Sequence, residues 1–295
     1  MDEFDQHRSL LFGIVYRMLG IVAEAEDVVQ ETGLRWLRQS KDEVRSPKAW
    51  QVATTTRMCI DQLRSARRQR EEYYGVWLPE PLVESSAPAA DENATMADSV
   101  TMAFMVMLET LSPVERAAFL LREVFDYDCD AISEIVGKSE ANCRQIVRRA
   151  KAELHERPTT EPIPDSRARL LAENFLTVAA TGATEDLMAL LTEDAVLYSD
   201  GGGKVVAAGR PIESRHHVAR FLVGIRRRRP ADMTMQVTWI NGRPGAITMS
   251  EGQVTNAITF DFEGDRVQTI YIIRNPDKLA ALTRNLDLKE QHDTH

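Results

Sequence analysis

The chain has 295 residues, of which 43% are hydrophobic and 27% charged, and its formal net charge at pH 7 is −9. This composition excludes a fully disordered or fibrous protein, and the length predicts about two domains, with three small ones as the alternative. An acidic total usually argues against a nucleic-acid partner. Here, however, residues 71–115 hold nine acidic side chains and no lysine or arginine, which equals the whole net charge. Basic clusters can therefore occur elsewhere in the chain.

Targeting signals and metal motifs are absent from the sequence. No stretch approaches the roughly 18 consecutive apolar residues of a membrane span, and the charged N-terminus lacks the layout of a signal peptide. The three cysteines, Cys59, Cys129 and Cys143, show neither metal-ligand nor redox spacing. We therefore expect a cytoplasmic protein with no membrane contact, no metal site and no cofactor.

Residues 4–69 read as helices throughout. Apolar side chains recur at helical spacing over residues 10–19 and again over 23–37. A further helix is expected from Pro47 to about Gln69, because Ser46 suits a helix cap and proline suits the first helical position. Its arginine-rich last turns suit either the negative end of the helix dipole or a surface that contacts phosphates.

A linker follows over residues 73–99, where prolines and acidic residues alternate with small polar ones. One piece of it, residues 73–82, contains two tyrosines, a tryptophan and two leucines. Leaving these side chains in water is unfavourable, so we expect this piece to dock on a folded surface.

Residues 100–158 are again helical, and they end in a helix-turn-helix pattern. Two short helices, 129–136 and 140–155, are separated by Gly137, and the second has an apolar stripe that begins at Cys143. The opposite face is polar and basic, with Asn142, Arg144, Gln145, Arg148 and Arg149. An ordinary helical hairpin with a solvated basic face is the alternative. The turn, cap, stripe and basic face together favour entry into a DNA major groove.

After a second linker at 158–165, the predicted secondary structure changes from all helix to a mixture of helix and strand. Helices are expected at 166–180, 184–191 and 216–228, with a last helix from Asn275. Strands are expected at 195–198, 205–208, 233–240, 246–250, 257–262 and 267–273. Apolar and polar residues alternate along 257–262, which predicts a bent antiparallel sheet with one buried face.

Several motifs carry a resemblance to a known family. Residues 24–32 (EAEDVVQET) look like the hallmark of region 2 of bacterial sigma factors of the extracytoplasmic-function group. The stretches 47–50 (PKAW) and 58–64 (MCIDQLR) continue that match in register. Residues 111–125 (LSPVERAAFLLREVF) and the helix-turn-helix resemble region 4. Gly33 departs from the pattern, because the family usually has a bulky residue there.

The tail resembles the SnoaL-like cone fold of polyketide cyclases and of nuclear transport factor 2, which encloses a pocket. The whole chain therefore resembles sigma factors with a fused SnoaL-like extension. The expected fold is multidomain, with all-α sigma regions followed by an α+β cone that has a curved antiparallel sheet. The expected domains are region 2 (1–72), an acidic linker (73–99), region 4 (100–157), a second linker (158–165) and the regulatory SnoaL-like domain (166–295).

The resemblance implies a transcription-initiation subunit that binds core RNA polymerase and promoter DNA. Region 2 is expected to dock on the β′ clamp helices through Asp27, Gln30 and Glu31. The −10 element is expected to contact Trp50, Arg57, Arg64, Arg67 and Arg68. Region 4 is expected to bind the −35 element through Asn142, Arg144, Gln145, Arg148 and Arg149, and the β flap through its apolar side. In sigma factors the connector between these regions runs through polymerase channels, which an acidic linker suits.

In the related proteins, the tail is understood to tune the sigma factor's own activity. Three motifs, one in the linker and two in the tail, support the resemblance to sigma factors with a fused SnoaL-like extension. They comprise Trp77, Pro79, Glu80, Pro81, Asp200, Gly201, Gly202, Gly203, Lys204, Asn275, Pro276, Asp277 and Lys278. We expect the linker motif to pack near the other two. The glycine run also suits a simple tight turn, and Asn275 a simple helix cap.

An alternative function is a ligand-responsive DNA-binding regulator or a cyclase-like enzyme with a helix-turn-helix domain. His216, His217 and Asp261 form no identifiable acid–base pair in the sequence, so we expect no catalysis. A small-molecule ligand of the tail pocket stays open.

Overall fold

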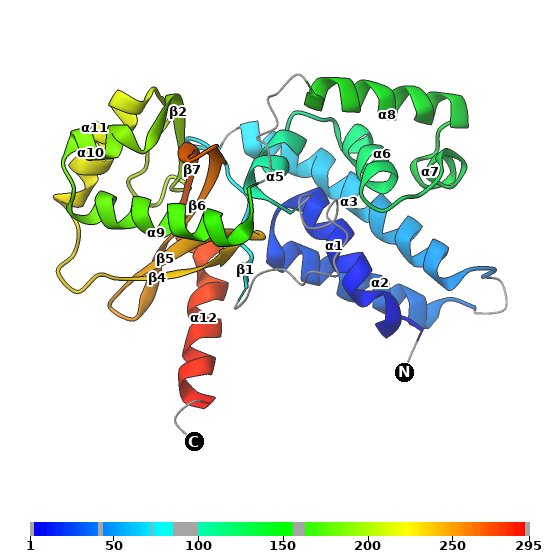
Figure 1. The fold of residues 1–295 in the computed structure, drawn as a ribbon. Helices are drawn as coiled ribbons and strands as arrows, with labels where there is room; N and C mark the ends of the chain where they lie inside the picture. The colour runs from blue at the N-terminus through cyan, green and yellow to red at the C-terminus, as the bar shows by residue number, and fades with distance from the viewer. Residues whose placement is uncertain (1–2, 41–43, 72, 85–99, 156–162, 293–295) are drawn as a thin grey trace. The chain divides into compact units, whose positions relative to one another are not determined.

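The computed structural model describes residues 3–40, 44–71, 73–84, 100–155 and 163–292 (Figure 1). These residues form two compact units. The N-terminal unit holds the described residues up to Glu71, Val100 and 104–155, and the C-terminal unit holds 73–84, 101–103 and 163–292. The first part of the acidic linker therefore belongs to the same unit as the tail. Within the described part of the chain, no helix is both long and apolar enough to cross a membrane.

The first half of the N-terminal unit is a bundle of helices. A 3-10 turn (η1, Asp5–His7) leads into α1 (Arg8–Leu19), α2 (Val22–Arg38) and α3 (Pro47–Glu71). Gly20 ends α1 with a left-handed φ of 73°, where glycine has no Cβ to clash. Leu11, Ile14 and Trp36 are among the largest fully buried side chains.

Gly33 has a packing reason in this structure. A Cβ atom there would lie 3.0 Å from Cε1 of Phe4, whose ring is buried against α2. Contacts this short require the neighbour to move. Phe4 thus fills the space that a bulky side chain at position 33 would need.

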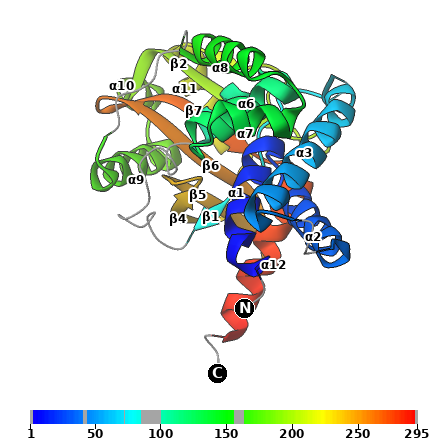
Figure 2. The same cartoon turned by 90° about the vertical axis from the view of Figure 1, so that its right-hand side faces the viewer.

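The second half of this unit comprises α5 (Met102–Leu108) from Phe104 onwards, α6 (Pro113–Glu123), α7 (Cys129–Val136) and α8 (Glu140–His155). A capping box starts α6, since Ser112 Oγ accepts from the Glu115 amide and Glu115 bonds back to the Ser112 amide. Helix α6 packs on α1 and α3, and α7 packs on α3 (Figure 2). Arg116, only 3% exposed, donates to the Met18 carbonyl oxygen at 2.7 Å. The two predicted sigma regions therefore pack together in one unit.

The C-terminal unit is built on a seven-stranded sheet with the order β1-β4-β5-β6-β7-β2-β3. The strands are β1 (Val83–Glu84), β2 (Leu191–Asp200), β3 (Ile212–Glu213), β4 (Thr234–Ile240), β5 (Arg243–Ser250), β6 (Gln253–Glu263) and β7 (Arg266–Ile273). The helices are α9 (Asp165–Thr181), α10 (Thr184–Ala189), α11 (Arg215–Arg226) and α12 (Pro276–His292). The predicted α+β tail is therefore confirmed.

Two details of the predicted sheet are wrong. The sheet is mixed, because β2 runs parallel to β7. No hairpin turn joins these two strands, so local turn chemistry does not fix their direction. The return strand expected at 205–208 does not form, because the Lys204 and Val205 amides both bond to the Gly201 carbonyl oxygen in a turn. Instead, Ile212 and Glu213 pair with β2.

The sheet has two differently covered faces, because successive side chains of a strand point to opposite sides. On one face, which we call the core face, Leu197, Phe260 and Ile272 join the apolar side chains of α9, α10 and α11. The opposite face, which we call the linker face, holds Asp200 and Tyr271. Residues on this second face meet the linker segment.

Candidate DNA-binding surface and linker-docking site

Helix α8 separates an apolar stripe from a polar face. The stripe of Cys143, Ile146, Val147, Ala150 and Leu154 is buried. The five predicted −35 residues, Asn142, Arg144, Gln145, Arg148 and Arg149, are all exposed. Arg144 pairs with Glu140 on the same helix, and Arg149 lies 3.8 Å from Glu115. Gly137 closes α7 with a φ of 67°, which sets the turn before α8.

The predicted −10 residues are distributed along α3. Trp50 is half-buried against Trp36, with a ring-centroid distance of 5.4 Å. Arg57 donates to the backbone oxygens of Glu134 at 2.8 Å and Ile135 at 3.0 Å, at the end of α7. Arg64 is exposed and pairs with Asp61. The side chains of Arg67 and Arg68 lie outside the described residues.

The predicted polymerase-docking residues lie on α2. Asp27 and Gln30 are exposed, and Glu31 accepts a hydrogen bond from Arg35 at 2.8 Å. Leu34 and Leu37 lie within the stretch 23–37, where apolar residues recur at helical spacing, but they are 42% and 68% exposed. Leu34 follows Asp27, Gln30 and Glu31 at helical spacing, so an exposed apolar side chain extends the acidic face.

Asp200, fully buried at the end of β2, is the centre of the linker-docking site. Its Oδ1 accepts from the Tyr73 hydroxyl at 2.6 Å and from the Gly202 amide at 3.0 Å. Its Oδ2 accepts from the Leu78 amide at 2.9 Å and from Lys278 Nζ at 2.7 Å. One carboxylate thus holds two parts of the linker, the glycine loop and the start of α12.

Lys278 completes this arrangement from α12. Its ammonium group also donates to the Leu78 carbonyl oxygen, and its side chain is only 5% exposed. The same ammonium group lies 4.3 Å from the centre of the Trp77 ring and 5.3 Å from that of Tyr73. These are favourable cation–π distances. The buried positive charge is therefore met by a carboxylate, a carbonyl and two aromatic rings.

Asn275 and the glycine loop fit closely around Tyr73. Asn275 Nδ2 donates to the Tyr73 hydroxyl at 2.9 Å, while its Oδ1 caps the Asp277 amide. A Cβ atom on Gly202 would lie 2.4 Å from Asn275 Nδ2, and the φ of Gly202 is 62°. Glycine is therefore required there both for conformation and for space. Burial, and then the bond to Asp200, raise the pKa of Tyr73 above its ordinary value.

The rest of the linker motif continues along the sheet. Leu78, Pro79, Glu80 and Pro81 are buried, and Val83–Glu84 adds an antiparallel strand to β4. Asn241 supports this edge with two hydrogen bonds to Leu82. Its side-chain Oδ1 accepts from the Leu82 amide, and its backbone amide donates to the Leu82 carbonyl oxygen. The sequence placed Tyr73 in the piece expected to dock, but without a specific partner, and it did not identify Asn241 as a docking residue. The turn signal Asn241-Gly242 pointed only to a hairpin.

Of the remaining loop motif residues, Gly203 and Lys204 are exposed, whereas Gly201 is buried. Lys204 pairs with Asp277 at 2.6 Å, and both side chains are more than half exposed. Gly201 is crowded, since a Cβ atom would lie 2.4 Å from the Val205 carbonyl oxygen. Pro276 is exposed at the first position of α12. Gly203 has a φ of 71° and approaches Tyr74.

The three titratable tail residues considered for catalysis do not converge. His216 and His217 are exposed on α11, whereas Asp261 is half-buried on the linker face. Burial raises the pKa of Asp261 to about 6, while the hydrogen bond from the Tyr271 hydroxyl at 2.9 Å acts in the opposite direction. Among the described residues, no group of three His, Cys, Asp or Glu side chains could hold a metal ion.

Comparison with known proteins gives a consistent result for both units. The profile of Sigma-70 region 2 matches residues 4–69, and that of Sigma-70 region 4 matches residues 101–154. The extracytoplasmic-function (ECF) RNA polymerase sigma factor SigJ of Mycobacterium tuberculosis is 33% identical over 95% of this chain and 93% of its own length. A probable ECF sigma factor, SigI, of the same organism is 27% identical over 95% of this chain and 94% of its own.

A solved structure extends this similarity to the fold. The crystal structure of M. tuberculosis SigJ superposes with a TM-score of 0.76 at 30% identity. The superposition covers 94% of this chain and 97% of that one, so it includes the tail as well as the helical regions.

We predict that Asp200→Asn strongly destabilises the C-terminal unit, because it removes the carboxylate that pairs with the buried Lys278 ammonium. Breaking a buried ion pair on one side lowers the free energy of unfolding by about 3–5 kcal/mol. Lys278→Met in the same chain should recover about 2 kcal/mol of that loss, as a double-mutant cycle in urea would measure. The exposed pair gives the control, since Lys204→Met with Asp277→Asn should show a coupling of about 0–1 kcal/mol. Equal coupling energies for the two pairs would contradict this assignment.

We also predict that Asp261 makes the free energy of unfolding depend on pH. Its pKa in the folded chain, about 6, exceeds the ordinary aspartate value of 3.8, so its contribution to stability is lost as pH rises from about 4 to 6. Asp261→Asn should therefore raise the free energy of unfolding at pH 7.5 by about 2–3 kcal/mol and leave it nearly unchanged at pH 4.

Asp265 provides a control of opposite sign for this measurement. Arg167 lowers the pKa of Asp265, so Asp265→Asn should lower stability at neutral pH, and this difference should vanish as pH falls. Urea unfolding across this pH range measures both variants. A flat difference between wild type and Asp261→Asn would show that Asp261 has an ordinary pKa.

Proposed function

The chain belongs to the ECF RNA polymerase sigma factors, and from that premise we propose which of its surfaces bind core polymerase, read the promoter and regulate the protein. As a sigma factor it binds core RNA polymerase and recognises promoter DNA to initiate transcription. This membership favours the sigma factor over the alternative of a ligand-responsive DNA-binding regulator or a cyclase-like enzyme in which the helical half merely binds DNA.

The −35 element is assigned to the polar face of α8. This assignment is supported by the exposure of Asn142, Arg144, Gln145, Arg148 and Arg149 together over a buried stripe. Arginine can pair with guanine and glutamine with adenine at base edges in the major groove. Asn142, near the N-terminal end of the helix, lies where helix-turn-helix proteins first meet the bases.

The −10 element is assigned to α3, through Trp50, Arg57, Arg64, Arg67 and Arg68. Arg57 bonds to the last carbonyl oxygens of α7, so its use on DNA requires α3 and α7 to separate. The closed N-terminal unit is therefore a state that precedes promoter binding in this proposal.

Core polymerase is assigned to the exposed face of α2 around Asp27, Gln30 and Glu31. Leu34 and Leu37 add apolar area beside these polar groups. Carboxylates set the orientation and the rate of association with a basic partner, while apolar contacts supply most of the affinity. This combination suits the β′ clamp helices that the family uses.

Regulation is assigned to the docked linker. The connector between regions 2 and 4 begins directly after α3, and residues 73–84 of it are held on the C-terminal unit. A linker bound there is not free to enter the polymerase. We therefore propose that docking on the tail and engagement of core polymerase compete for the same segment, and that the tail acts by binding rather than by catalysis.

The first experiment tests the α8 assignment by in vitro transcription with core polymerase from the protein's own promoter. Arg148→Ala and Gln145→Ala should each weaken promoter binding by about 1–3 kcal/mol, because a base contact is lost. Transcription from the promoter should fall accordingly. Lys151→Ala is the matched control, since Lys151 lies on the same helix but pairs with Glu123. If all three variants transcribe equally well, α8 does not read the promoter.

The second experiment tests the competition. Trp77→Ala combined with Pro79→Ala should release the linker, increase its cleavage by protease and raise the affinity for core polymerase. Tyr74→Ala provides the control, since Tyr74 belongs to the same segment but is 76% exposed. Protease cleavage that rises without any gain in polymerase affinity would refute the competition, and unchanged cleavage would refute the docking itself.

A further inference from the structure

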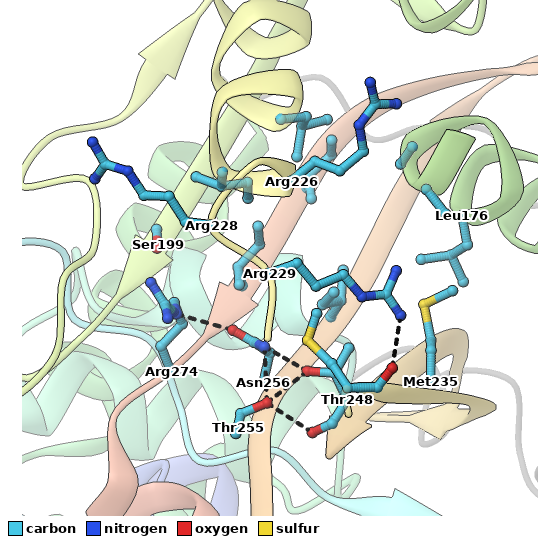
Figure 3. Close-up of a pocket in the computed structure, with 18 of the residues that line it drawn as sticks. Leu176, Ser199, Arg226, Arg228, Arg229, Met235, Thr248, Thr255, Asn256 and Arg274 are labelled. Atoms are coloured by element: carbon cyan, nitrogen blue, oxygen red, sulfur yellow. Dashed lines mark hydrogen bonds between the residues drawn. The ribbon is translucent and has the colours of Figure 1, made fainter. Parts of the chain in front are cut away.

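The C-terminal unit contains a cavity of about 390 Å³ on the core face of its sheet, against α9 and α11 (Figure 3). Its wall is mostly apolar and includes Phe175, Leu176, Phe221, Phe260, Ile270 and Ile272. Sites for small organic ligands have volumes of about 300–1,000 Å³ and mostly apolar walls. The cavity has the size and lining of such a site.

The polar part of the wall is unusually basic, with Arg226, Arg228, Arg229 and Arg274. Arg229 donates to the Met233 carbonyl oxygen at 3.1 Å, and Arg274 donates to Asn256 Oδ1 at 2.9 Å and to the Val206 carbonyl oxygen. Within the described residues, none of the four pairs with a carboxylate. Figure 3 shows Arg229 reaching towards Met235 and Arg274 lying beside Asn256.

These cations are held where a positive charge is unfavourable. Arg229 and Arg274 are half-buried, and burial lowers the pKa of Arg274. Their acceptors are neutral amide and carbonyl oxygens, which leave the charges uncompensated. A partly desolvated guanidinium without a counter-charge is stabilised strongly by an anion, and a carboxylate matches its planar donor geometry.

We propose that this cavity binds an amphipathic organic anion, with its apolar body among the phenylalanine and leucine side chains and its carboxylate at the basic part of the wall that includes Arg229 and Arg274. Asn256 fixes the position of Arg274, and Thr248 and Thr255 in turn bond to Asn256. An uncharged ligand of the same shape gains only the apolar contacts. A cationic one is repelled by the arginines.

The cavity and the linker-docking site share the same two strand ends. Ser199 lines the cavity, while its neighbour Asp200 binds the linker; Arg274 lines the cavity, while its neighbour Asn275 binds Tyr73. The Arg274 amide also donates to the Asp200 carbonyl oxygen at 2.7 Å. A ligand that moves Arg274 therefore acts on the residues that hold the linker. This coupling rests on the proposed regulatory role of the linker, whereas the ligand site does not.

Titration calorimetry of the full-length chain with decanoate tests the site. We expect decanoate to bind at least tenfold more tightly than 1-decanol, and decyltrimethylammonium to bind more weakly still. Arg229→Gln should weaken decanoate at least tenfold and leave 1-decanol unchanged, and Arg229→Lys should restore part of the loss. Arg227→Gln is the matched control, because it removes the same charge from the same arginine run but from outside the cavity lining.

Two outcomes of this titration overturn the proposal. Equal binding of decanoate and 1-decanol would show that no anion site exists. Equal losses in Arg227→Gln and Arg229→Gln would show a diffuse basic surface, such as one for nucleic-acid phosphates, in place of the cavity.

Limited proteolysis of the linker tests the coupling. Decanoate should change the cleavage rate of the linker at least threefold in the wild-type chain but not in Arg229→Gln. Binding without any change in cleavage would overturn the coupling alone. Neither measurement contains polymerase or DNA, so its failure is distinguishable from a failure of the sigma-factor assignments.

Discussion

The buried pair of Asp200 and Lys278 is the interaction on which the C-terminal unit's regulatory architecture depends. Two opposite charges taken out of water are tolerated only when nearly every donor and acceptor is satisfied. Here the linker itself supplies the missing partners, through the Leu78 amide and carbonyl groups and the Tyr73 hydroxyl. Without the linker, the pair would be incompletely bonded. The tail is therefore built to hold this segment of its own chain.

Because side chains alternate along a strand, the pair of Asp200 and Lys278 lies on the opposite face of the sheet from the cavity. One face of the sheet encloses an apolar cavity with a basic rim, and the opposite face carries the linker. Because adjacent residues of β2 and of the end of β7 serve different faces, the cavity and the docked linker are only one residue apart along each of these segments. A sheet of this kind can connect a small ligand to a protein segment without a hinge or a domain movement.

The charge distribution of the chain fits the same picture. The acidic excess lies in residues 71–115, outside α8, whose exposed face is basic. The expectation that the acidic linker suits the channels of the polymerase needs one revision. Glu80 is only 4% exposed when the linker is docked. Its carboxylate cannot face a basic polymerase channel in that state. Release from the tail would therefore expose both the apolar and the acidic groups of the linker.

The sequence by itself determined the helical regions, the helix-turn-helix with its exposed basic face, and the α+β character of the tail, because periodicity, caps and turn residues are local signals. It also identified Asp200, Asn275 and the linker motif as residues of interest. Only the tertiary structure decided the parallel pairing of β2 with β7, the strand contributed by Val83–Glu84, the engagement of Arg57 by α7 and the four arginines around one cavity. These features join residues far apart in the chain, and no local pattern specifies such pairings.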